Sequence, residues 1–158
     1  MSKKTLKGTK TTSKTGETYR AMKDRQQKEI SDFPMFFAFT QKSFDEGMVK
    51  LGLKPEETNK ISKLGDLGGF YRKTDAKTLY DLFDRHEKEQ ALAIENDATG
   101  DGFVFDMFNY ELRNHEYVYT GDVTEAIEAV GFTTEEVYKN KKLLHGLNKA
   151  IKAQPKDY

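Results

Sequence analysis

The chain has 158 residues, no cysteine and a formal net charge of zero. The lack of cysteine excludes disulfides, a thiolate nucleophile and a sulfur-ligated zinc site. No apolar run approaches the roughly 20 residues that a membrane-spanning helix needs, and the N-terminus lacks the apolar region of a secretory signal. We therefore expect a soluble, cytoplasmic protein.

The N-terminal end is basic and poor in apolar residues. Residues 1–16 contain five lysines, no acidic residue and a single large apolar side chain, Leu6. Such a composition cannot bury enough surface to order itself. We expect residues 1–18 to form a flexible basic arm and residues 30–154 to form one compact domain.

The compact domain is predicted to be α+β, rich in helices, with a small sheet. The aromatic run at 33–39 predicts a buried strand. A short amphipathic helix follows and ends at Gly52, and Pro55 suits the first turn of another helix. The glycine pair that opens residues 68–73 favours a second strand.

The second half of the domain is predicted to be helical. The apolar spacing over residues 74–95 gives the strongest helix, and another helix follows the loop at 96–102. Residues 117–122 suit a short strand or an extended link. Two helices are predicted to complete the chain, over 122–132 and over 133–154.

The neutral net charge conceals three segregated blocks. Residues 1–80 carry 17 basic against 10 acidic residues, residues 81–136 carry 3 against 15, and residues 137–158 carry 6 against 1. The blocks either attract one another within the fold or leave an acidic face for a basic partner. The sequence leaves both interpretations open.

The loop around residues 97–102 resembles the first half of a calcium-binding EF-hand loop. Asp97, Thr99 and Asp101 alternate as ligands would, and glycine stands at the sixth position. However, Phe105 and Phe108 occupy the ninth and twelfth positions, where oxygen ligands are required. We therefore interpret the loop as a corner between helices.

This interpretation makes specific predictions about the corner. The preceding helix ends at Asn96, Gly100 takes a positive φ, and Asp101 caps the next helix.

A second hypothesis is a metal-dependent enzyme. Glu111 and His115 stand four residues apart on one predicted helix, and His86 lies on the preceding one. Imidazole with carboxylate suits zinc, iron or manganese. No dedicated metal motif is present, both histidines fall on apolar stripes, and no nucleotide-binding or nucleophile motif occurs, so neither a cofactor nor an enzyme is expected.

A third hypothesis is nucleic-acid binding. It would use the arm and the alternation of aromatic and basic residues in FYRK. The neutral charge of the chain argues against it. Its candidate residues are Lys3, Lys4, Lys7, Lys10, Tyr71 and Arg72.

Two motifs, FDRHEKE and DMFNYELRNHEY, carry a family resemblance. With their surroundings over residues 33–150, they resemble an uncharacterised family of small bacterial and phage-encoded proteins. The resemblance implies a compact domain and a mobile-element context, and it implies no chemistry.

The function we expect is non-enzymatic. By analogy with small phage proteins, the chain would bind and inhibit a host nucleic-acid-handling or defence complex, as anti-CRISPR proteins do. An acidic face would compete with nucleic acid for a basic groove of that host protein or protein–nucleic-acid complex. The candidate residues for this contact are Asp97, Asp101, Asp106, Glu116, Asp122 and Glu125.

Overall fold

The computed structural model describes residues 16–156, and its elements confirm an α+β fold rich in helices with a small sheet. The described residues belong to two compact units, whose boundaries fall inside helix α1 (Tyr19–Ser31) and helix α3 (Ala76–Asn96). We call residues 26–87 the sheet unit, and residues 16–25 with 88–156 the helical unit. The arm predicted for residues 1–18 falls mostly on residues 1–15, which lie outside the described part of the chain.

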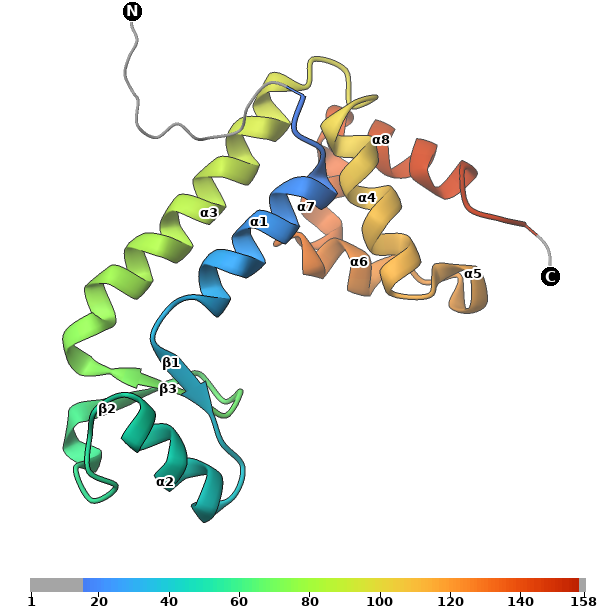
Figure 1. Ribbon diagram of the computed structural model, residues 1–158. Helices are drawn as coiled ribbons and strands as arrows, with labels where there is room; N and C mark the ends of the chain where they lie inside the picture. The colour runs from blue at the N-terminus through green and yellow to red at the C-terminus, as the bar shows by residue number, and fades with distance from the viewer. Residues whose placement is uncertain (1–15, 157–158) are drawn as a thin grey trace, which may run out of the picture. The chain divides into compact units, whose positions relative to one another are not determined.

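The sheet unit is built on three antiparallel strands in the order β1-β3-β2. Figure 1 shows helix α2 beside this sheet. The elements in chain order are β1 (Met35–Phe37), α2 (Gln41–Lys50), the 3-10 turn η2 (Thr58–Lys60), β2 (Ile61–Leu64), β3 (Gly69–Arg72) and the 3-10 turn η3 (Lys73–Asp75).

Aromatic rings fill the space between α2 and the sheet. Phe36 stacks on Phe70 with ring centroids 5.3 Å apart, and Phe44 of α2 meets both rings edge-on. Met48 is fully buried beside them. Thr40 begins α2 with a capping box, in which its hydroxyl accepts a hydrogen bond from the N–H of Ser43. One helix therefore covers one face of the sheet.

One prediction for this unit was only partly confirmed, and another was wrong. The buried strand expected at 33–39 is short, and Phe36 is buried whereas Phe37 and Phe39 are 54% and 82% exposed. Side chains alternate between the two faces of a strand, and α2 covers only one of them. The helix expected from Pro55 is replaced by η2 and β2, because pairing with β3 and burial of Ile61 outweigh a favourable helix start.

The helical unit packs its helices around α4. Figure 1 shows α4 beside α8. Gly146 of α8 lies so close to Val104 of α4 that an added Cβ would come within 2.4 Å of that side chain. Phe108, Leu112 and Leu147 are fully buried in this core. The elements after α3 are α4 (Phe103–Asn114), α5 (Tyr117–Thr120), α6 (Thr124–Ala129), α7 (Thr134–Lys139) and α8 (Lys141–Lys152).

The boundaries of the later helices differ from those expected. Residues 117–120 form a helical turn instead of a strand or an extended link. The single helix expected over 133–154 is broken at Asn140, which takes extended backbone angles and accepts a hydrogen bond from the N–H of Leu143. This asparagine ends α7 and caps α8, a role its side chain favours over a helix interior.

The close approach of α2 to the sheet can be tested at Gly47. An added Cβ there would meet the ring of Phe36 at 2.1 Å. Helix propensity alone predicts that Gly47→Ala stabilises the protein by about 1 kcal/mol. We expect destabilisation by about 1–3 kcal/mol instead, because the ring has to move.

Thermal unfolding of the full chain measures this change. Glu46→Ala, at the exposed neighbouring position, serves as the control and should stay within about 0.5 kcal/mol of the parent. An equal or higher Tm for Gly47→Ala would contradict the packing.

Candidate functional site

The loop between α3 and α4 is organised by the carboxylate of Asp97. It accepts backbone hydrogen bonds from Gly100, Gly102 and Val104, each 3.0 Å long, and from Thr99 at 3.3 Å. The last residue of α3 is Asn96, and Gly100 has a φ of 95°. Both features were predicted from the sequence. The capping residue is not the expected Asp101, because Asp97 reaches the N–H groups at the start of α4.

Asp101 ties the same loop to α8. Its Oδ1 lies 2.7 Å from Nε2 of His145 and 3.1 Å from Nζ of Lys149. These contacts lower the pKa of Asp101 to about 2, and the hydrogen bond with His145 has the largest effect. Two of the predicted partner-binding carboxylates, Asp97 and Asp101, therefore stabilise the fold.

The pKa of Asp97 connects this loop to the pH dependence of stability. Burial alone would raise this pKa, but the four backbone hydrogen bonds together lower it. A lowered folded-state pKa means that Asp97 stabilises the fold above its unfolded pKa of about 3.9 and loses this contribution as the pH falls.

We expect Asp97→Ala to lower the free energy of unfolding by about 1–3 kcal/mol at pH 7, since four backbone donors lose their acceptor. The loss should shrink as the pH approaches 3. Denaturant titrations at several pH values measure it, with Glu95→Gln at an exposed neighbouring position as the control. A loss that does not change with pH would contradict the charged role of Asp97.

Asp106 faces a cavity in the helical unit. The cavity has a volume of about 580 Å³ and is also lined by Glu17, Thr18 and Asp97. Burial, and then the negative charge of Asp97, raise the pKa of Asp106. Asp106, one of the predicted partner-binding residues, is therefore half-buried and does not lie on an exposed surface.

A buried carboxylate joins α1 to α4. Glu111 is fully buried, and its Oε2 accepts hydrogen bonds from the hydroxyl of Tyr19 at 2.5 Å and from Nζ of Lys23 at 2.9 Å. Burial alone would raise the pKa of Glu111, but these two hydrogen bonds and the charge of Lys23 lower it. Burial and the hydrogen bond to Glu111 raise the pKa of Tyr19 far above its ordinary value.

The second oxygen of Glu111 also has partners. Nδ2 of Asn114 lies 3.4 Å from Oε1, and so does Nε2 of His115. The other ring nitrogen of His115 lies 3.6 Å from Glu125. Tyr19 and Lys23 were not predicted from the sequence as partners of Glu111. The available signal was a carboxylate on the apolar stripe of a helix, which requires a cationic partner when buried.

We expect Lys23→Met to destabilise the protein by about 1–3 kcal/mol, because the buried carboxylate of Glu111 loses its cation. The pKa of Glu111 should rise, so that the acid limb of the stability curve moves to higher pH. Unfolding titrations across pH 3–8 measure both effects.

Lys28→Met is the matched control on the same helix. Lys28 pairs with Asp32 on the exposed surface, where an ion pair contributes about 0–1 kcal/mol. Equal losses for the two variants would contradict the buried role of Glu111.

The metal hypothesis required His86, Glu111 and His115 to share a site. His86 lies in the sheet unit, where its Nε2 is 2.6 Å from Oε1 of Glu29. Glu111 and His115 are in contact in the helical unit. Within residues 16–156, no group of three or more His, Asp or Glu side chains has an arrangement that suits a metal ion.

Two candidate residues of the nucleic-acid hypothesis, Tyr71 and Arg72, have structural roles within the fold. Tyr71 is 5% exposed, so its ring is not available to stack on a base. Arg72 binds the carboxylate of Asp75 and the carbonyl oxygen of Leu51. The remaining candidates, Lys3, Lys4, Lys7 and Lys10, lie outside the described residues.

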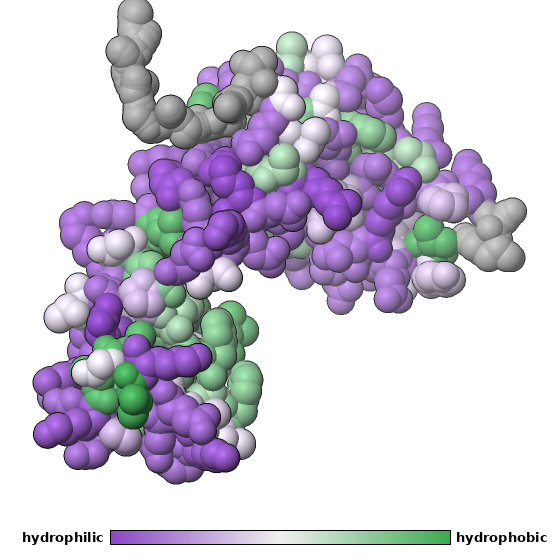
Figure 2. Space-filling view, in the orientation of Figure 1, coloured by the Kyte–Doolittle hydropathy of each residue, from purple (hydrophilic) through white to green (hydrophobic). Residues whose placement is uncertain are grey.

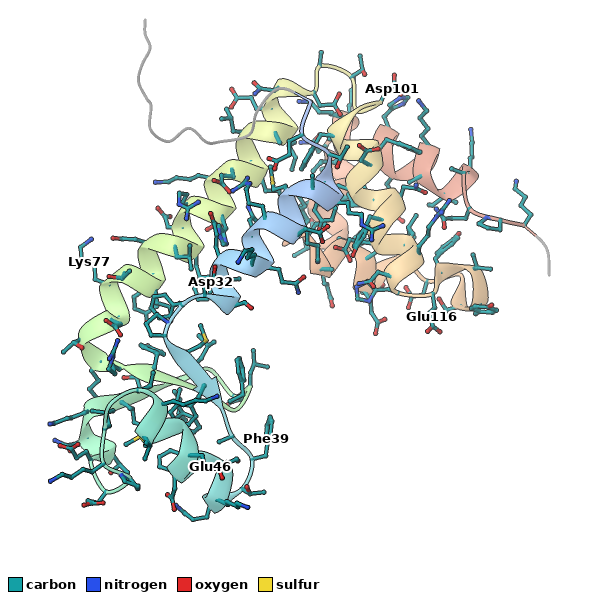
Figure 3. All side chains as sticks on the ribbon, viewed as in Figure 1. Asp32, Phe39, Glu46, Lys77, Asp101 and Glu116 are labelled. Atoms are coloured by element: carbon teal, nitrogen blue, oxygen red, sulfur yellow. The ribbon has the colours of Figure 1, made fainter. Side chains whose placement is uncertain are left out.

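Three of the predicted carboxylates gather around α5 and the start of α6. Glu116 precedes α5, Asp122 follows it, and Glu125 stands in the first turn of α6. All three are exposed, and Figure 3 shows Glu116 at the junction of α4 and α5. Asp122 also accepts a hydrogen bond from the N–H of Thr124. We call Glu116, Asp122 and Glu125 the acidic surface.

Comparison with known proteins identifies a family whose function is unknown. Residues 18–153 match the family of unknown function DUF7659. No curated protein and no solved structure matches the chain. None of the helices within residues 16–156 has the length and apolarity needed to cross a membrane.

Proposed function

The chain belongs to this family of unknown function, and from that premise we propose that it is a non-enzymatic binding protein that uses its acidic surface. Its partner is a protein, or a protein–nucleic-acid complex, that presents a basic surface.

The conformation of Glu116 carries this proposal. With a φ of 57° it is the one non-glycine residue in the described chain that has a positive φ. A left-handed conformation costs an ordinary residue about 1–2 kcal/mol, and strained residues gather at functional positions. A glycine would remove the strain here, but it would also remove an exposed carboxylate.

The surroundings of Glu116 support the same function. Neither Glu116 nor Asp122 forms an ion pair with any residue between 16 and 156. Glu125 is 73% exposed and only loosely paired with His115. Carboxylates that the fold does not neutralise are available to steer and hold a basic partner.

The partner class follows from the chemistry of the acidic surface. A lysine- and arginine-lined groove that holds nucleic-acid phosphates also accepts a cluster of carboxylates. We propose, by analogy with small phage proteins, that a phage or mobile element encodes the chain and that it inhibits a host nucleic-acid-handling or defence complex of the kind anti-CRISPR proteins block.

A charge variant tests this proposal. Glu116→Lys and Glu125→Lys reverse two charges, and Asp122→Asn removes a third while keeping an oxygen that caps α6. We expect the triple variant to lose at least about tenfold in affinity for a basic partner and to become less sensitive to salt. The measurement is capture of proteins from the source cells by the tagged full chain, followed by titration of the captured protein.

The matched control makes the same change in net charge elsewhere. It combines Glu46→Lys, Glu56→Lys and Glu95→Gln, three exposed positions without an ion pair to a described residue. Circular dichroism confirms that both variants fold. If the two triple variants bind the captured protein equally, the acidic surface is not the contact and the proposal fails.

A further inference from the structure

The three-stranded sheet has two outer edges, because β1 and β2 each pair only with β3 in the order β1-β3-β2. One of these edges is β1. The N–H of Ala38 donates to the carbonyl oxygen of Gly68 at 2.9 Å, and in an antiparallel ladder only every second residue faces a given neighbour. The N–H and C=O groups of Met35 and Phe37 therefore point away from β3, and in the described chain no strand pairs with them.

Exposed apolar side chains lie beside this edge. Phe37 is 54% exposed, Phe39 82% and Leu67, in the turn between β2 and β3, 70%. Figure 2 shows hydrophobic surface along this part of the sheet unit, and Figure 3 shows Phe39 pointing away from the ribbon. An apolar group of this kind next to an open sheet edge marks an interaction site.

Two glycines leave room for the rings to lie close to the backbone. A Cβ added at Gly68 would come within 2.4 Å of the Phe39 ring, and one added at Gly69 would come within 3.0 Å of the Phe37 ring. Because the rings rest on backbone, their outer faces stay free for a partner. A cavity of about 240 Å³ adjoins Phe39 and is also lined by Lys63 and Phe70, with room for one large apolar side chain.

The size of this surface argues against a second copy of the chain as the occupant. A buried aromatic side chain removes about 150–250 Å² from water, so the exposed parts of Phe37 and Phe39 amount to about 200–340 Å². A stable interface buries about 800 Å² on each partner. A peptide strand needs less area, because main-chain hydrogen bonds supply much of its affinity.

We propose that β1 is a docking edge for an extended peptide segment of a partner protein. The segment adds as a fourth strand, bonds to the outward backbone groups of Met35 and Phe37, and carries apolar side chains at alternate positions. One of these side chains packs on Phe37 and Phe39 or enters the adjoining cavity. This surface lies in the sheet unit and is independent of the acidic surface in the helical unit.

The probe for this proposal is a synthetic peptide of alternating valine and threonine with a lysine at each end. Full-length, ¹⁵N-labelled protein is titrated with it up to about 1 mM, the weak end of measurable affinity. We expect shifts confined to β1, residues 38 and 39 and the β2–β3 turn. Hydrogen exchange at the Met35 and Phe37 amides should slow by at least about tenfold.

Two controls separate strand addition from simple apolar contact. The same peptide with all its interior amides N-methylated keeps its apolar side chains but loses its donors, so it should not bind. Phe39→Ser should weaken binding at least about tenfold, whereas Tyr138→Ser, at an exposed ring in the helical unit, should not change it.

Three results would overturn the proposal. One is the absence of any shift at 1 mM peptide, and another is equal binding of the N-methylated peptide. The third is protection of the Met35 and Phe37 amides that grows with protein concentration alone, because this would assign the edge to a second copy.

Discussion

The packing of α4 on α8 is the contact on which the helical unit depends. A glycine at 146 lets Val104 approach the backbone of α8, and the rest of the core forms around these two helices. The loop before α4 then has to turn within a few residues, and Asp97 makes this possible by accepting four backbone hydrogen bonds. Asp101 closes the corner from outside through α8. The direction of α4, set in this way, determines where α5 and α6 begin.

The acidic residues of the chain therefore have two distinct roles. Asp97, Asp101 and Glu111 are each held by backbone donors or by cationic side chains, and they stabilise the fold. Glu116 and Glu125 lie on the outside of the same unit with little to neutralise them. The attraction between charged blocks thus holds for Asp101 and Glu111, whereas an acidic face for a basic partner stays a proposal. A count of charges along the chain does not distinguish the two.

The successes and failures of the sequence analysis have physical causes. The helices α3 and α4 were predicted because an apolar stripe of helical period runs through each of them. Helix α1 was missed because it buries little beyond Tyr19 and Met22, so its pattern is almost entirely polar. The strand β2 was mistaken for helix because Pro55 and the glutamates after it suit a helix start, whereas the strand depends on its pairing with β3 and on the burial of Ile61.

The candidate sites show the same division. The corner at 96–102 was confirmed in the end of α3 at Asn96 and the positive φ of Gly100, whereas its expected cap, Asp101, was wrong because Asp97 takes that role. The roles of Tyr71 and Arg72 were not predictable, since exposure and hydrogen-bond partners depend on residues distant along the chain. The partners of Glu111 were hidden for the same reason, because Tyr19 and Lys23 lie about 90 residues away from it.

The sequence by itself determined the fold class, the main helices, the corner at 96–102 and the absence of cysteine chemistry. These features follow from composition and local periodicity, which act over a few residues. Only the tertiary structure decided which carboxylates are neutralised, which aromatic residues are buried and which strands lie at the edges of the sheet. Burial and hydrogen-bond satisfaction are set by contacts between distant segments, so a side chain acquires its role only when the helices and strands come together.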